Sequence, residues 1–113
     1  MDKDITEEIF IYRAVGVEEY YSIIDNHKFI CDPQMSEVKY FAFDFEETLL
    51  YANKAYNSDV VAIFQTRLKK CDLNRLGDFT HVDPSIFKSG TVIVQLDKLD
   101  LFNACVIETI LKM

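Results

Sequence analysis

The stretch that decides the fold is residues 9–15, IFIYRAV, followed by Gly16 and by VEEYYSII at residues 17–24. The first run is rich in β-branched and aromatic residues, which is typical of a buried strand. After Gly16, apolar residues recur at i, i+3, i+4 and i+7, which predicts an amphipathic helix of roughly three turns. Glu18 and Glu19 fall in its first turn, where the helix dipole favours acidic side chains.

A second strand and helix follow. Residues 38–43, VKYFAF, predict a strand. Asp44, with Glu47 three residues later, forms an aspartate version of the capping box. Apolar side chains then recur in steps of 4, 3 and 4 up to residue 56, as on one face of a helix. The continuous apolar run VVAIF at residues 60–64 predicts a third strand, buried on both faces or central in its sheet.

The second half of the chain is richer in loops. Residues 68–76 are weakly helical, and Gly77 stands where a helix commonly ends in a left-handed residue. Residues 79–89 are expected to be irregular, with a turn or short helix opening at the Asp-Pro pair. Residues 97–103 are expected to be a connector. Two more strands are predicted, at residues 91–96 (TVIVQL) and 105–111 (CVIETIL).

This order predicts a single α+β domain over residues 1–113. The later strands have no helices between them, so we expect a mixed, partly antiparallel sheet with two N-terminal helices. A chain of 113 residues with only three glycines and two prolines is not a fibrous or low-complexity protein. It has no glycine-rich phosphate-binding motif of the dinucleotide or P-loop type.

Nineteen acidic and twelve basic residues give a formal charge of −7. General nucleic-acid binding is therefore disfavoured, and an acidic surface favours a basic protein partner. The only dense basic run, residues 67–70, is interpreted as a solvated loop or helix face. The sequence shows neither a secretory signal nor an apolar run long enough for a membrane span, so we expect a soluble, cytoplasmic protein.

The cysteines and histidines do not form a recognisable site. Cys31, Cys71 and Cys105 lie 40 and 34 residues apart, without the spacing of a zinc site. We interpret them as small core residues in a reducing compartment. His27 and His81 have no cysteine at a spacing that indicates a cysteine hydrolase.

Two charges inside predicted strands are candidates for chemistry. Arg13 either forms a structural pair with an internal acid, lies exposed on an open face, or points its guanidinium at a phosphate or carboxylate in a cleft. Glu108 either lies on a partly wet face with Val106 and Ile110 or projects into a cleft opposite Arg13. Each of the two could explain why the other lies in a strand.

Aromatic side chains on the first two strands suggest a second kind of site. Tyr12 and Tyr40, if they share a face of the sheet, could stack a planar ring such as a nucleobase or nicotinamide. Phe41 must then point to the other face, because neighbouring residues of a strand alternate. The alternative is that all three are core residues.

Four segments of the chain together resemble the mono-ADP-ribosyltransferase superfamily. They are the tract IYRA at residues 11–14, the helix after it, the tract KYFA at residues 39–42 and the capped helix 44–56. The pattern is similar to small bacterial domains with an ADP-ribosyltransferase-like fold, several of them toxin-associated. The resemblance covers residues 9–66 in detail and the remainder in outline.

The resemblance implies a transferase for which NAD is a substrate and which needs no metal. It implies that Tyr12 and Arg13 hold NAD, with Arg13 at its phosphate or ribose. Tyr40 and Phe41 stand where the family usually has Ser-Thr-Ser, and Glu108 stands as the late catalytic glutamate, with Val106 where the family has Glu or Gln. The implied activity is ADP-ribosyl transfer to a protein acceptor or NAD glycohydrolysis. The alternative is a catalytically inactive binding or regulatory protein on the same fold.

Overall fold

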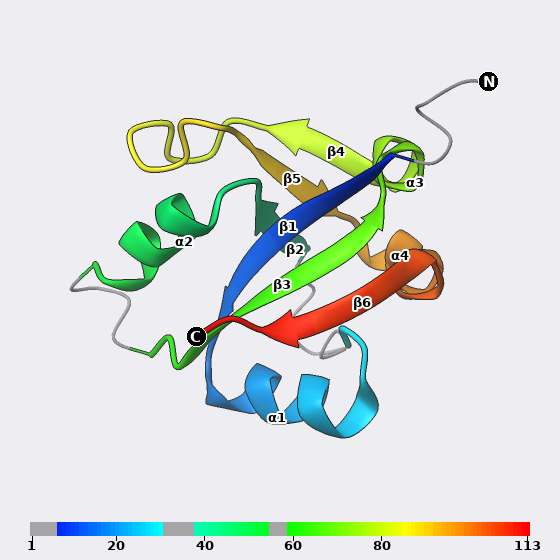
Figure 1. Cartoon of the computed structure of the whole chain (residues 1–113), viewed down its shortest axis with the longest axis horizontal. Helices are drawn as coiled ribbons and strands as arrows, with labels where there is room; N and C mark the ends of the chain where they lie inside the picture. The colour runs from blue at the N-terminus through cyan, green and yellow to red at the C-terminus, as the bar shows by residue number, and fades with distance from the viewer. Residues whose placement is uncertain (1–6, 31–37, 55–58) are drawn as a thin grey trace.

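The computed structural model describes residues 7–30, 38–54 and 59–113. Within them the strands are β1 (Glu8–Val15), β2 (Lys39–Ala42), β3 (Ala62–Lys69), β4 (Gly77–Thr80), β5 (Thr91–Val94) and β6 (Val106–Leu111). The helices are α1 (Val17–Asn26), α2 (Phe45–Ala52), α3 (Lys70–Leu76) and α4 (Leu99–Cys105), with a short 3₁₀ helix, η3 (Leu96–Lys98). The strands form one sheet in the order β4-β5-β2-β1-β3-β6 (Figure 1).

The α+β prediction is confirmed, but the expectation of a mixed sheet is wrong. Every ladder between neighbouring described strands is antiparallel. α1 lies beyond the end of β1, so the chain re-enters the sheet from that end and β2 runs antiparallel to β1 (Figure 1). β2 and β3 do run in the same direction on either side of α2. Since β1 lies between them, they form no parallel ladder.

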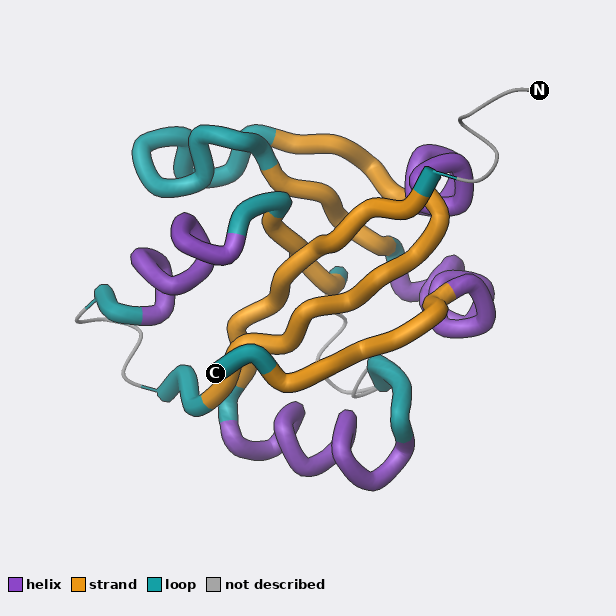
Figure 2. The backbone as a smooth tube through the Cα atoms, in the orientation of Figure 1, coloured by secondary structure: helices purple, strands orange, loops and turns teal. Residues whose placement is uncertain are grey.

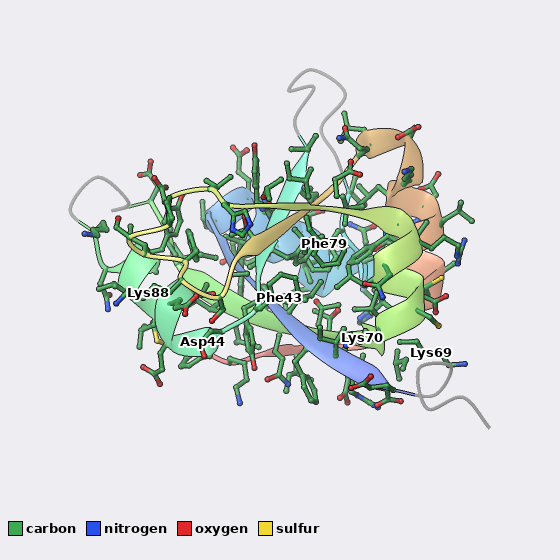
Figure 3. All side chains as sticks on the ribbon, turned by 90° about the horizontal axis from the view of Figure 1, so that it is seen from above. Phe43, Asp44, Lys69, Lys70, Phe79 and Lys88 are labelled. Carbon is green, nitrogen blue, oxygen red and sulfur yellow. The ribbon has the colours of Figure 1, made fainter. Side chains whose placement is uncertain are left out.

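The expectation of two helices, both N-terminal, is also wrong, because α3 and α4 follow in the second half. Residues 97–103, predicted to be a connector, contain most of η3 and most of α4. The predicted irregular stretch 79–89 begins inside β4. Phe79 of this edge strand stacks on Phe43, with ring centroids 5.9 Å apart and planes 7° apart (Figure 3).

The main core lies on one face of the sheet, because successive strand residues point to opposite faces. Ile11 and Val15 of β1 are buried there with Phe64 and Leu68 of β3. Helices α1, α3 and α4 supply the other side of this core, through residues that include Ile23, Leu73, Leu76, Leu99 and Phe102. We call this side of the sheet the core face.

The opposite side, which we call the α2 face, is only partly covered. α2 and the loop between β4 and β5 lie together at one end of it (Figure 2). Ala42, Ile86 and Phe87 form a small second cluster there, against which Tyr51 of α2 packs. This face therefore has room for a site that the main core does not have.

None of the helices in the described part of the chain is both long and apolar enough to cross a membrane.

Gly77 is required by close packing, whereas the sequence suggests a left-handed helix end. Its backbone is extended, with φ −103° and ψ 151°, and it is the first residue of β4. A Cβ at this position would lie 2.5 Å from Cγ2 of Val92 and 3.0 Å from the carbonyl oxygen of Leu73. Val92 is fully buried, so it has little freedom to move away.

We therefore expect Gly77→Ala to lower the free energy of unfolding by about 1–3 kcal/mol, as overpacking of a core does. Urea denaturation measures this loss. Gly16→Ser is the control, because a Cβ there meets only the carbonyl oxygen of Asp59, at 3.4 Å, and serine is a favourable N-cap. Equal stability of the two variants would contradict the packing explanation.

Candidate functional site

A pocket with a volume of about 610 Å³ opens on the α2 face. Strands β1, β2 and β5 form its floor, and α2 and the loop 82–87 form its walls. Five aromatic residues line it: Tyr12, Tyr40, Phe41, Tyr51 and Phe87. Thr48, Thr91 and Asp83 add polar groups. A volume in this range is usual for a site that holds a small molecule.

The pocket brings together all four residues for which the sequence suggested a binding role, Tyr12, Arg13, Tyr40 and Phe41. Tyr12 lies opposite Ala42 in the β1–β2 ladder, which places Tyr12 and Tyr40 on the same face. The ring of Phe41 points to the core face, where it contacts the rings of Phe29 and Phe102. Phe41 therefore contributes to the floor and offers no free ring.

Arg13 is held in an ion cluster on the core face, which we call the Arg13–Glu19–Lys39 cluster. Its Nε and Nη2 donate to the two carboxylate oxygens of Glu19, at 2.6 and 2.8 Å, and its Nη1 donates to the carbonyl oxygen of Tyr40 at 3.1 Å. Nζ of Lys39 donates to Glu19 at 3.2 Å. The side chains of Arg13 and Glu19 are each 17% exposed. Of the interpretations that the sequence left open for Arg13, this is the pair with an internal acid.

The charge state of Glu19 is fixed by its two cationic partners. Burial alone would raise the pKa of this carboxyl group, but the hydrogen bonds and charges of Arg13 and Lys39 outweigh it and lower the pKa below its ordinary value. Glu19 is therefore ionised at neutral pH. Its charge balances the guanidinium that would otherwise be free to bind an anion.

Glu108 lies elsewhere. It is 53% exposed and faces Arg67 across the β3–β6 ladder, with an oxygen 3.7 Å from Nη2 of Arg67. Arg67 also binds Glu8 at 2.7 Å. The basic run 67–70 is therefore not a solvated loop or helix face at Arg67, because β3 continues to Lys69 and Arg67 is ion-paired within the sheet.

Arg13 and Glu108 point to opposite faces of the sheet. Arg67 lies opposite Phe10 in the β1–β3 ladder, whereas Arg13 lies opposite Phe64, a core residue. Residues 10 and 13 of one strand face opposite ways, and Glu108 shares the face of Arg67. The structure therefore does not bring Arg13 and Glu108 into one cleft.

The walls of the pocket are fixed by hydrogen bonds. The Asp44 half of the predicted capping box is confirmed, since the backbone N–H of Glu47 donates to the Asp44 carboxylate at 3.0 Å. The Glu47 side chain does not complete the box, because its carboxylate bonds to another residue. The Glu47 carboxylate accepts from the backbone N–H and the hydroxyl of Ser89, at 3.1 and 2.8 Å, and so ties α2 to the loop. Thr80 and Thr91 share a hydroxyl–hydroxyl bond of 2.6 Å. The pocket is thus preformed.

Asp83 is fixed in the loop by its own backbone. Its carbonyl oxygen accepts hydrogen bonds from the N–H groups of Ile86 and Phe87, each at 2.9 Å. Its φ is +45°, a left-handed value that only a few per cent of non-glycine residues adopt. Sequence reasoning explained Asp83 by turn chemistry alone, and this turn is confirmed. It missed that the turn places Asp83 at a pocket.

Thr48, Tyr51 and Phe87 were also missed as site residues. Thr48 and Tyr51 lie three residues apart on the predicted helix and so share one of its faces, which was a usable signal. Phe87 lies in a stretch expected to be irregular, and no periodicity marks it.

Comparison with protein-family models, with curated proteins and with solved structures finds no match to this chain. The resemblance to ADP-ribosyltransferases stays a prediction that rests on the sequence of residues 9–66.

Proposed function

We propose that this chain is a binding protein that takes a small molecule with a planar ring into the pocket on the α2 face, without processing NAD. The observation that carries the proposal is the placement of Tyr12 and Tyr40 on one face, in a pocket also lined by Tyr51 and Phe87. A ring that enters this pocket meets aromatic surface from β1, β2, α2 and the loop. Each well-placed ring pair contributes about 0.5–1.5 kcal/mol beyond the area it buries.

The rigidity of the walls supports binding of this kind. α2 and the loop are joined through Glu47 and Ser89, and the rings of Tyr51 and Phe87 lie with centroids 5.3 Å apart. A preformed pocket loses little conformational freedom when it is filled, so more of the contact energy is available for affinity.

The position of the charges favours binding over NAD chemistry. Cleavage of the nicotinamide bond needs a carboxylate where positive charge develops, and the phosphates need a cation to position them. Glu108 is on the same face as the pocket aromatics but two strands away, on the edge strand β6. The guanidinium of Arg13 is engaged by Glu19 and by the Tyr40 carbonyl.

ADP-ribosyl transfer or NAD glycohydrolysis is the competing proposal, and nicotinamide release separates the two. With NAD at millimolar concentration we expect the wild-type chain and Glu108→Gln to release nicotinamide no faster than buffer. Release by the wild type that is lost in Glu108→Gln would overturn the binding proposal and establish Glu108 as the catalytic acid.

Ring binding itself is tested by thermal shift, because a ligand that binds only the native state raises Tm. We expect planar heterocycles at saturating concentration to raise Tm of the wild type. The shift should fall at least threefold in Tyr40→Ala, which removes a 44% exposed ring from the pocket floor. Tyr21→Ala is the control, since Tyr21 is an exposed tyrosine of α1 outside the pocket. Equal loss in both variants would contradict a site at Tyr40.

A further inference from the structure

We infer that the pocket selects a planar ring that carries a positive charge, such as a pyridinium or quinolinium ring, and that the carboxylate of Asp83 attracts this charge. The inference rests on the proposed function and adds the chemical class of the ligand. It comes from the balance of charge and of aromatic surface around the pocket.

The aromatic lining is the first part of this balance. The face of an aromatic ring is negative and attracts cations, more strongly when water is excluded. Tyr12, Tyr40, Tyr51 and Phe87 come from three different directions, the floor, α2 and the loop. A cationic ring gains from such surroundings both by stacking and by cation–π attraction. A neutral ring of the same shape gains only by stacking.

The charged lining residues are the second part. Among the residues that the structure describes, two of those that line the pocket carry a charge, Arg13 and Asp83. The guanidinium of Arg13 lies on the core face, where it is paired with Glu19. In the described part of the chain, no side chain makes an ion pair with the carboxylate of Asp83. The uncompensated charge of the pocket is therefore negative.

The surroundings add to this charge. Asp44 caps α2 at the pocket wall. Tyr12 is a lining residue, and the pKa of its phenol is raised first by burial and second by the negative charge of Asp44. Lys88 lies in the same loop and is exposed, as Asp83 is, but it is not a lining residue of the pocket. A ligand that carries phosphate or carboxylate would meet repulsion from Asp83 and Asp44, and the described lining residues include no unpaired cationic side chain to offset it.

Backbone geometry keeps Asp83 in place for this role. The two hydrogen bonds to its carbonyl oxygen and its left-handed φ fix the loop around it. A non-glycine residue in this conformation is often found at a functional site, where the surrounding structure holds it. The carboxylate is thus presented by a rigid turn, so little order has to be gained when a cation binds.

The test uses rings that share one skeleton and differ in charge through a single small substituent. The whole chain is titrated by calorimetry with 1-methylquinolinium (cation), quinoline (neutral) and quinoline-3-carboxylate (anion), and with the corresponding three forms of pyridine. We expect the cation to bind about tenfold more tightly than the neutral ring and the anion to bind most weakly. The advantage of the cation should shrink as salt is added, since salt screens the attraction.

Asp83→Asn keeps the shape of the side chain and removes its charge. We expect it to reduce the advantage of the cation to twofold or less while the neutral ring binds as before. Asp100→Asn, an exposed aspartate of α4, is the control and should change nothing.

The possible failures are distinguishable. If neutral and cationic rings bind the wild type equally, or if the anion binds best, the charge inference is overturned and the proposed function stands. If Asp83→Asn binds the cationic ring with the same advantage over the neutral ring as wild type does, Asp83 is not the residue that selects the cation. If no ring of either size and any charge binds, the proposed function itself fails.

Discussion

Replacing Glu19 with glutamine is expected to lower the free energy of unfolding by about 2–4 kcal/mol, because loss of one partner from a largely buried ion pair leaves the other uncompensated. Here one carboxylate serves two cations, with Nε of Arg13 at 2.6 Å and Nζ of Lys39 at 3.2 Å. Glutamine keeps the size of the side chain, so the loss reports charge and hydrogen bonding. Urea denaturation of the purified variant measures it.

Arg13→Met provides the matched comparison. It leaves Glu19 paired with Lys39, and methionine retains much of the apolar stem, so we expect a smaller loss of about 1–2 kcal/mol. If Arg13→Met proves as destabilising as Glu19→Gln, the single anion is not the centre of the cluster.

The same cluster predicts a pH dependence. Because the folded-state pKa of Glu19 lies below its reference value of 4.5, the unfolded state binds more protons between the two pKa values. The stabilisation is therefore complete above the unfolded pKa and is lost as the pH falls through the lowered folded pKa. The difference in stability between wild type and Glu19→Gln should be constant from pH 7 to about pH 5 and shrink at lower pH. A difference that grows on acidification would contradict this assignment.

The cluster also bears on function. A guanidinium that holds the end of β1 to α1 and to the Tyr40 carbonyl has a structural task. To bind a phosphate, Arg13 would have to leave Glu19. The loss of unfolding free energy in Arg13→Met measures how much the pairing of Arg13 with Glu19 contributes to stability. A large loss supports the binding proposal, and a negligible one would remove this support.

The first half of the fold could be predicted because its patterns are strong. IFIYRAV and the capped helix after Asp44 carry dense local signals, and both elements begin within one residue of where the sequence places them, although α2 ends at Ala52 and not at residue 56. That Tyr12 and Tyr40 share a face was only a condition at the level of sequence, because it depends on the register of β1 against β2. The partner of Arg13 was not predicted, because both Glu18 and Glu19 fit the first turn of α1. Only the exact phase of that helix against the sheet selects Glu19.

The second half was harder for a different reason. β4 and α4 have four and seven residues, too few for a hydrophobic period to be recognised. The place of Glu108 depends on strand register, and antiparallel pairing with Arg67 puts it on the edge strand and away from Arg13. Long-range pairing of this kind is not written in local sequence.

Phe102 lies in a stretch that the sequence predicts to be a connector, yet it is a central residue of the core. It is fully buried, and its ring contacts Phe41 and Phe29 with centroids 5.2 and 6.1 Å apart. The next residue, Asn103, receives the N–H of Phe29 at 2.9 Å and donates to the carbonyl of Phe29 at 2.7 Å. α4 therefore holds the segment that follows α1 against the core face of the sheet.

We expect Phe102→Ala to lower the free energy of unfolding by about 3–5 kcal/mol, the usual range for removing a buried aromatic side chain. Leu101→Ala, at a 55% exposed neighbour in the same helix, should cost less than about 1 kcal/mol. Similar losses in the two variants would show that α4 does not pack as described. Because Phe41 joins the core to the pocket floor, a folded Phe102→Leu variant should bind the cationic ring more weakly than wild type, although residue 102 is not itself a lining residue. Unchanged binding there would mean that the floor holds its shape without the aromatic cluster beneath it.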